Sequence, residues 1–246
     1  MAGEQRSLLL TGASRGIGHA TVKRFMQDGW HIITVSRQPF AKVCPWPGGG
    51  ENHIELNLAD LDGVARALAR IRDRLPDGKL HALVNNAAIS PKGPGGKRLG
   101  TLDTELALWH HVFNVNFFAT IVLAQGLKDE LVKAQGTIIN VTSIAGSRVH
   151  PFAGSAYATS KAALAALTRE FAGDFGRLGV RVNAIAPGEI DTAILSPGTE
   201  KIVAEQIPMH RLGTPDEVAK IIYVLCTDTS SYVNGAEIHI NGGQHV

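Results

Sequence analysis

The chain has 246 residues, of which 44% are hydrophobic and 19% charged, and its formal net charge is +2. This length fits one large α/β domain or two small ones, and the composition argues against long disordered segments and coiled coils. The small net charge gives no indication of a nucleic-acid or membrane surface. The two cysteines, Cys44 and Cys226, have no metal-ligand spacing and suit a reducing compartment. No segment approaches about 18 uninterrupted apolar residues, and the N-terminal apolar run is too short for a signal peptide, so we expect a cytoplasmic protein.

Short β-rich apolar runs alternate with helical patterns along the chain. In the clearest helical pattern, Leu61, Val64, Leu68, Ile71 and Leu75 form one apolar stripe. Apolar strands that alternate with helices predict an α/β, doubly wound fold: a seven-stranded, mostly parallel sheet with helices on both faces. The predicted strands are residues 7–11, 31–36, 53–57, 82–85, 137–141, 180–186 and 237–240.

A glycine-rich turn, TGASRGIG at residues 11–18, follows the first predicted strand and leads into a helix. Gly12 permits the sharp turn, Gly16 lets the backbone approach a pyrophosphate, and Gly18 lets the helix pack close to the sheet. Backbone N–H groups and the positive helix end would face the phosphates. The spacing G-x-x-x-G-x-G differs from the usual dinucleotide fingerprint, and a tight turn without a ligand is the alternative interpretation.

The strand, turn and helix together predict a Rossmann fold, and no composition break marks a second domain. We therefore expect residues 1–246 to form a single dinucleotide-binding and catalytic domain. Two Gly/Pro-rich stretches, residues 44–52 and 91–100, are expected to be surface loops within it.

The end of the second predicted strand indicates which dinucleotide binds. An NAD site would carry an acidic residue here for the ribose 2′-OH, but this chain has Ser36 followed by Arg37. Arg15, in the glycine turn, adds a second guanidinium. Two guanidiniums near the adenosine ribose would pair with a 2′-phosphate, so we predict NADP(H) rather than NAD(H). Two solvated surface arginines are the alternative.

Tyr157 and Lys161 lie four residues apart in SAYATSK, a spacing that puts both on one helix face. A free phenol has a pKa of about 10, and a nearby ammonium, together with the positive charge of an oxidised nicotinamide, would lower it. Tyr157 is therefore predicted to be the general acid for ketone reduction and the general base for alcohol oxidation. Ser143 directly follows the fifth predicted strand, where its hydroxyl would donate to the substrate's carbonyl oxygen.

These motifs occur in the order and at the distances typical of the short-chain dehydrogenase/reductase family, which the chain resembles over essentially its whole length. They are TGASRGIG at 11–18, NNAA at 85–88, NVN at 114–116, TSIAG at 142–146, YATSK at 157–161, APGEIDT at 186–192 and GAEIHINGG at 235–243.

The resemblance implies further roles for individual residues. Lys161 would also hold the nicotinamide ribose, and Asn116 would support a water-linked proton path, with Asn114 as its nearby competitor. Asn57 stands where many members have Asp near the adenine, which leaves that contact plausible but less certain. The cofactor contacts implied are Gly12, Ser14, Arg15, Gly16, Ile17, Gly18, Ser36, Arg37, Asn57, Leu58, Asn86, Ala87, Tyr157, Lys161, Pro187, Gly188, Ile190 and Thr192.

The segment after the sixth predicted strand, about residues 189–211, fits a mobile lid, with an ordinary long loop as the alternative. His110 and His111 are adjacent and lack a carboxylate–His arrangement, so we expect no metal site. Family members usually form tetramers or dimers through the long fourth and fifth helices. The alanine-rich stretch at residues 161–167 would permit close helix approach.

The resemblance implies an NADP(H)-dependent oxidoreductase that acts on a small-molecule carbonyl or alcohol substrate. The likeness is appreciable to the 3-oxoacyl-[acyl-carrier-protein] reductase branch, especially in IPMHRLGTPDEV at residues 207–218, but it leaves the substrate open. A carrier-protein partner would need a basic patch at the site entrance; Lys128, Lys133 and Arg177 are candidates, and solvated helix faces explain them equally well. The rival function is a catalytically silent NADPH-sensing protein, which could dispense with the Ser, Tyr and Lys set.

Overall fold

One seven-stranded sheet forms the centre of the computed structural model, which describes residues 5–40, 49–192 and 198–246. The strands are β1 (Ser7–Thr11), β2 (His31–Ser36), β3 (His53–Glu55), β4 (Ala82–Asn85), β5 (Thr137–Val141), β6 (Arg181–Pro187) and β7 (Glu237–Ile240). Their order is β3-β2-β1-β4-β5-β6-β7, and each neighbouring pair is parallel. The predicted doubly wound fold is confirmed.

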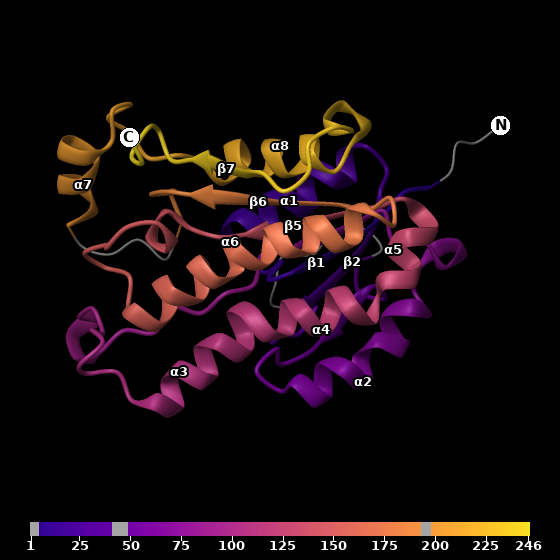
Figure 1. The fold of residues 1–246 in the computed structure, drawn as a ribbon, viewed down its shortest axis with the longest axis horizontal. Helices are drawn as coiled ribbons and strands as arrows, with labels where there is room; N and C mark the ends of the chain where they lie inside the picture. The colour runs from indigo at the N-terminus through magenta and orange to yellow at the C-terminus, as the bar shows by residue number, and fades with distance from the viewer. Residues whose placement is uncertain (1–4, 41–48, 193–197) are drawn as a thin grey trace.

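Among the described residues, helices join β1 to β2 and each successive pair of strands from β3 to β7, and they cover both faces of the sheet. Their bounds are α1 (Gly16–Gln27), α2 (Leu61–Arg72), α3 (Leu106–Phe113), α4 (Ala119–Gly126), α5 (Lys128–Ala134), α6 (Ser155–Gly176), α7 (Thr199–Gln206) and α8 (Pro215–Leu225). The helices α2, α4 and α6 lie across one face, and α1 and α8 cover the other (Figure 1).

The alternation of side chains along the strands divides the core between these two helix layers. In β1, Leu9 packs into the cluster that contains Val64 of α2, whereas Leu8 and Leu10 pack with Phe25 of α1. All three leucines are fully buried. Because successive residues of a strand point to opposite faces, a sheet covered on both sides requires this continuous apolar run.

The third strand is shorter than predicted, since it ends at Glu55 rather than at residue 57. The Asn57 side chain accepts a hydrogen bond from the backbone N–H of Ala59 at 3.1 Å, which turns the chain towards α2. Asp60 then caps α2 by accepting from the Gly63 N–H at 2.9 Å. The predicted stripe continues beyond the helix, because Leu75 is buried although α2 ends at Arg72.

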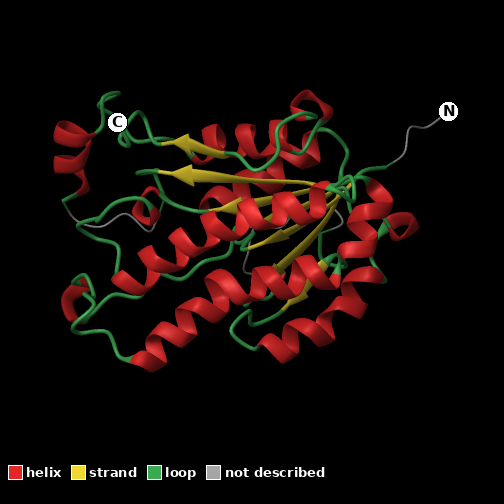
Figure 2. Ribbon diagram, viewed as in Figure 1, coloured by secondary structure: helices red, strands yellow, loops and turns green. Residues whose placement is uncertain are grey.

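The strands all end towards the side of the molecule where α7 and the C-terminus lie (Figure 2). The strand order reverses between β1 and β4, which are direct neighbours at the centre of the sheet. In open parallel sheets, ligands bind in the crevice outside the carboxyl ends of the strands at such a reversal. The topology therefore locates the site before any side chain is considered.

The run Leu106–Gly126 is long and apolar enough to cross a membrane, judged by length and composition alone. It consists of α3, a π-helical segment (Asn114–Phe118) and α4. This run packs against α2 and α6 in the outer layer of the fold. A helix of such a layer passes the same test, so the run is weak evidence for a membrane span.

Candidate functional site

A cavity of about 620 Å³ lies at the carboxyl ends of the central strands. Its size suits a small-molecule or cofactor site. The predicted residues that line it are Gly12, Ser14, Arg15, Gly16, Ile17, Ser36, Arg37, Asn57, Leu58, Asn86, Ala87, Ser143, Tyr157, Lys161, Pro187, Gly188, Ile190 and Thr192. Two predicted site residues, Gly18 and Asn116, lie behind its wall instead.

The glycine turn is packed so closely that side chains would not fit. Gly12 has a φ of +72°, and a Cβ there would lie 2.7 Å from the Cα of Ala87. A Cβ on Gly18 would lie 2.1 Å from the carbonyl oxygen of Gly12. Asn86 fixes the turn, because its Nδ2 donates to the carbonyl oxygens of Thr11 at 3.1 Å and Gly12 at 2.9 Å. The bare backbone at the start of α1 fits the phosphates of a dinucleotide.

Two arginines give the other end of this cavity an uncompensated positive charge. Arg15 and Arg37 both line it, and neither makes a hydrogen bond or ion pair within the described residues. Ser36 is turned towards the loop, where its Oγ donates to the carbonyl oxygen of Gln38 at 3.0 Å. The ring Nε2 of His53 lies 2.8 Å from the same carbonyl oxygen. Among the described residues, Arg37 rather than Ser36 is thus the group whose donors remain available for a phosphate.

Ser143, Tyr157 and Lys161 converge on the cavity from two elements. α6 begins at Ser155, so Tyr157 and Lys161 occupy its first two turns, while Ser143 follows β5. The phenol of Tyr157 is hydrogen-bonded to the side chain of Ser143. Lys161 is only 2% exposed; its Nζ donates to the carbonyl oxygen of Val141 at 2.5 Å and lies 5.8 Å from the ring centroid of Tyr157.

In the chain alone, burial is the largest cause of the pKa shifts of both residues of this pair. Burial raises the pKa of the Tyr157 phenol above its ordinary value, the hydrogen bond to Ser143 opposes this rise, and the charge of Glu189 adds to it. Burial lowers the pKa of Lys161 to about 7. The lysine nitrogen is held by the Val141 carbonyl. The chain by itself therefore does not lower the phenol pKa, because that needs a further positive charge beside the ring.

Asn116 lies one layer behind the cavity, in the π-helical segment between α3 and α4. It is 1% exposed; its Oδ1 accepts from the N–H of Ile89 at 2.9 Å, and its Nδ2 donates to the Ile89 carbonyl at 3.1 Å. The same Nδ2 also donates to Ser160 Oγ at 3.0 Å. Asn114 instead donates to the carbonyl of Ala59 at 3.2 Å, away from α6. Of the two candidates, Asn116 is the one tied to the cavity wall, through Ile89.

Three polar residues that the sequence analysis missed, Lys92, His150 and Glu189, also line the cavity, beside Tyr157. His150 Nε2 and Glu189 Oε1 lie 2.6 Å apart, and their side chains are only 10% and 11% exposed. Lys92 donates to the carbonyl oxygen of Phe152. His150 and Glu189 are separated by 39 positions in sequence, so no local spacing could have predicted their contact.

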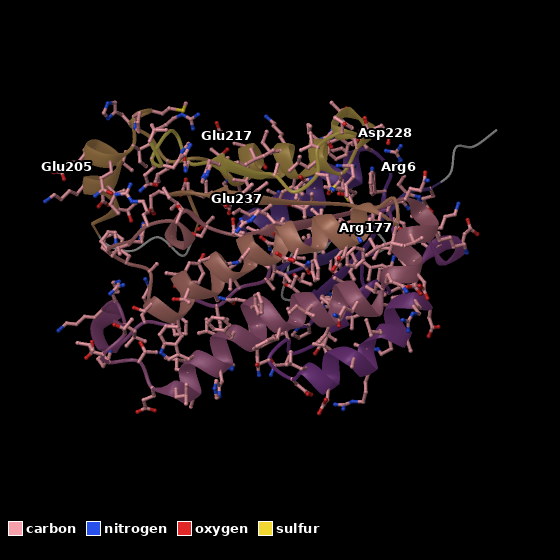
Figure 3. The ribbon with its side chains drawn as sticks, viewed as in Figure 1. Arg6, Arg177, Glu205, Glu217, Asp228 and Glu237 are labelled. Carbon is pink, nitrogen blue, oxygen red and sulfur yellow. The ribbon has the colours of Figure 1, made fainter. Side chains whose placement is uncertain are left out.

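The basic residues proposed for a carrier-protein patch are not at the cavity entrance. Lys128 and Lys133 lie on α5, which ends just before the first residue of β5, and Arg177 directly follows α6. These positions belong to the amino ends of the strands, the opposite edge of the sheet, where Figure 3 labels Arg177. None of the three lines the cavity. All three side chains are exposed, so the structure favours the alternative interpretation, solvated helix faces.

Part of the expected lid falls outside the described residues, namely 193–197. The described remainder contains α7, which lies at the side of the molecule where the strands end (Figure 1). Within the described ranges, no group of three or more His, Cys, Asp or Glu side chains is placed to hold a metal ion. His110 and His111 are successive residues of α3.

Known proteins are similar to this chain in sequence and in fold. The family profile described as "Enoyl-(Acyl carrier protein) reductase" matches residues 12–245. Protein FixR of Bradyrhizobium diazoefficiens is 59% identical, over 99% of this chain and 88% of FixR. The 3-oxoacyl-[acyl-carrier-protein] reductase FabG of Aquifex aeolicus is 32% identical over 96% of this chain and 95% of its own. A crystal structure of a Brucella ovis oxidoreductase of the short-chain dehydrogenase/reductase family, in complex with a partially ordered NAD, is 59% identical with a TM-score of 0.84, covering 97% of this chain and 100% of its own.

Proposed function

The chain belongs to the short-chain dehydrogenase/reductase family, and we propose that it is an NADP(H)-dependent oxidoreductase acting on a carbonyl or secondary alcohol. The observation that carries this proposal is the convergence of Ser143, Tyr157 and Lys161 on the cavity that the glycine turn also lines. A protein that only sensed NADPH would not need that set of side chains.

The cavity residues fit a nicotinamide dinucleotide. The backbone of the glycine turn would hold the diphosphate, Arg15 and Arg37 the 2′-phosphate, and Lys161 the nicotinamide ribose. When bound, the nicotinamide supplies or accepts the hydride. The Brucella ovis relative is described with NAD. For this chain we favour NADP(H), because both guanidiniums line the cavity and have no other partner among the described residues.

Tyr157 would hold and deliver the proton at its phenolic oxygen. In ketone reduction, the phenol donates its proton to the substrate oxygen and becomes a phenolate; in alcohol oxidation, the proton returns. The Ser143 hydroxyl would donate to the same substrate oxygen, where negative charge develops. The ammonium of Lys161 would stabilise the phenolate, and each unit by which the phenol pKa falls corresponds to about 1.4 kcal/mol. Asn116 would act by holding Ile89 and the first turns of α6 in place.

We further propose that the protein works in the cytoplasm as a homodimer or homotetramer. The described residues 189–192 and 198–211 would form part of a lid over a small-molecule substrate. Cys226 is buried, and burial raises the pKa of its thiol, which agrees with a structural rather than a reactive cysteine.

The test is NADPH and NADH oxidation by the purified protein with a panel of small ketones, ketoses and 3-oxoacyl thioesters. We expect turnover with NADPH and a loss of about 100-fold or more in kcat for Tyr157→Phe, with NADPH binding nearly intact by calorimetry. Appreciable activity in Tyr157→Phe would remove this residue from the mechanism. Tight NADPH binding without oxidation by any substrate would favour the sensing function instead.

A second candidate function is reduction of 3-oxoacyl thioesters carried by an acyl carrier protein. The FabG relative, at 32% identity over nearly the whole chain, favours it. The same panel distinguishes the two, because a thioester reductase would prefer a 3-oxobutanoyl thioester over simple hydroxylated ketones.

A further inference from the structure

We propose that Lys92, His150 and Glu189 form a recognition site for a hydroxyl group next to the reacting carbonyl, so that the substrate is a small α-hydroxy ketone or the corresponding vicinal diol. This inference rests on the proposed function and specifies its substrate class. The three side chains line the same cavity as Ser143 and Tyr157.

The hydrogen bonds of His150 assign its tautomer. Its Nδ1 lies 3.2 Å from the backbone nitrogen of Phe152 and 3.3 Å from that of Ala153, and both N–H groups donate to it. The proton of a neutral ring is therefore on Nε2, which donates to Glu189 Oε1 at 2.6 Å. The other tautomer, with its proton on Nδ1, would point that proton at the hydrogens of these two N–H groups. His150 thus orients the carboxylate of Glu189 through this hydrogen bond.

Glu189 lines the cavity and has a second oxygen available for a further hydrogen bond. Oε1 accepts from His150, whereas Oε2 accepts no hydrogen bond from any described residue. The side chain is only 11% exposed. A carboxylate with so little contact to water gains from a further donor. The charge of Glu189 also acts on the phenol of Tyr157, which places this acceptor close to the reacting group.

Lys92, in the loop that follows β4, provides a donor on the wall of the same cavity. Its Nζ is anchored by the carbonyl of Phe152, two residues after His150, and retains further N–H groups. The charge of Glu189 acts on Lys92, but no ion pair joins the two side chains among the described residues. The wall next to Tyr157 therefore holds an acceptor with negative charge and a donor with positive charge that do not satisfy each other.

A hydroxyl is the group that matches both. It donates to Glu189 and accepts from Lys92, and it is neutral, so neither charge repels it. An ammonium would pair with Glu189 but be repelled by Lys92. A carboxylate would pair with Lys92 but be repelled by Glu189. An alkyl chain would remove both charged groups from water and replace none of their hydrogen bonds. A site of this kind discriminates strongly against an analogue that lacks the hydroxyl.

The reaction leaves the recognised hydroxyl unchanged. Bound NADPH would supply the hydride for the new C–H bond at the carbonyl carbon, the C=O π bond would open, and Tyr157 would give its proton to the oxygen. An α-hydroxy ketone becomes a vicinal diol, and NADPH becomes NADP⁺. The reverse reaction oxidises the diol.

Hydroxyacetone and butanone are the matched probes, because they differ only by a hydroxyl in place of a methyl group. Binding of each probe to the NADPH-loaded Tyr157→Phe protein is measured by saturation-transfer NMR, which reports recognition without turnover. We expect hydroxyacetone to bind at least 10-fold more tightly than butanone. Glu189→Gln in the same background should reduce this ratio about 10-fold, and Lys92→Met should also reduce it.

The control is Asp228→Asn, which makes the same carboxylate-to-amide change. Asp228 pairs with Arg6 at 2.8 Å on the surface, at the opposite end of the sheet (Figure 3), and its substitution should leave the ratio unchanged. Equal binding of the two probes, or a ratio that Glu189→Gln does not change, overturns the inference, as does tighter binding of aminoacetone or pyruvate.

Turnover by the otherwise unmodified enzyme separates this inference from the proposed function. Reduction of butanone and hydroxyacetone at equal kcat/KM supports an oxidoreductase and overturns the recognition site. Selective binding of hydroxyacetone without any NADPH oxidation supports the recognition site and rejects the proposed function.

Discussion

Arg37 is the side chain on which the choice between the two dinucleotides depends most. It lies directly after β2, lines the cavity and makes no hydrogen bond or ion pair within the described residues. Arg37→Asp would remove one charge-assisted contact to a 2′-phosphate and supply an acceptor for a ribose hydroxyl. We expect the ratio of kcat/KM for NADPH to that for NADH to fall by about 10-fold to 100-fold. Steady-state kinetics with both cofactors measures this ratio.

Arg177→Asp is the matched control, since Arg177 is exposed and distant from the cavity. It should leave the ratio unchanged. An unchanged ratio in Arg37→Asp as well would show that the arginines do not select the cofactor.

Lys161 makes the stability of the cofactor-free protein depend on pH. Its pKa is about 7 in the folded protein and near the ordinary 10.5 when unfolded. Between these values the unfolded chain binds a proton that the folded chain does not, so this residue makes stability rise with pH. Below about pH 7 both states are protonated, and the full cost of burying the ammonium remains.

Lys161→Met removes this titration. The free energy of unfolding of the unmodified protein, minus that of the variant, should therefore rise between about pH 7 and about pH 9, by at most about 1.4 kcal/mol per pH unit. Denaturant unfolding of the two cofactor-free proteins at several pH values gives this difference. A flat or falling difference would mean that Lys161 stays charged when buried.

Whether a contact in the site could be predicted from the sequence depended on how far apart its two residues are in the chain. Tyr157 and Lys161 were predictable because a helix places residues i and i+4 on one face. His150 and Glu189 were not, because their contact joins two loops that only the finished sheet brings together. The protonation of Tyr157 was also beyond the sequence, since it depends on burial and on the charge of Glu189.

The contact between α1 and the glycine turn depends on Gly18 having no side chain. An added Cβ would lie 2.1 Å from the Gly12 carbonyl oxygen, so helix or turn must move. Gly173, in α6, has nothing within 4 Å of the same added atom. Gly18→Ala should lower the free energy of unfolding by about 1–3 kcal/mol and weaken NADPH binding. Gly173→Ala should raise it by about 0.5–1 kcal/mol, because alanine is the better helix former.

Denaturant unfolding and calorimetric NADPH titration of both variants test this pair. If Gly18→Ala were as stable as Gly173→Ala and bound NADPH normally, the close approach of helix and turn would contribute neither to stability nor to cofactor binding.

Strands were predicted more accurately than the irregular elements between them. Six of the predicted strands agree with the structure within about a residue at each end, because two-sided burial leaves an unbroken apolar run in the sequence. The π-helical segment around Asn116 has no such pattern. It is stabilised by contacts from Asn116 to the Ile89 backbone and to Ser160, which are distant in sequence.

At the scale of the molecule, chain order explains both where the predicted cofactor residues gather and why the three basic residues do not reach the cavity. Parallel strands with helical crossovers put every βα connection at one edge, so the predicted cofactor residues gather there. Each described helical crossover returns the chain to the opposite edge before the next strand begins. α5 ends at Ala134, close before β5, so its lysines could not have stood at the entrance.

The outer face of α3, α4 and α6 leaves apolar surface uncovered in the isolated chain. Phe118 is 42% exposed and Leu106 is 68% exposed. Ala162 and Ala166, on the neighbouring α6, are exposed and small enough to let another helix approach. Two copies could bury this face against each other across a two-fold axis, as in most homo-oligomers. We therefore expect a dimer or tetramer at micromolar concentration.

Phe118→Glu would place a charge in that interface, and light scattering should report a lower molar mass than for the unmodified protein. Met26→Glu is the control, because Met26 is similarly exposed, at 40%, on α1 on the other side of the sheet. Circular dichroism of both variants verifies that each folds. A monomeric unmodified protein, or a Phe118→Glu variant with unchanged mass, would show that this helical face is not where the copies meet, and the exposed phenylalanine would then need another explanation.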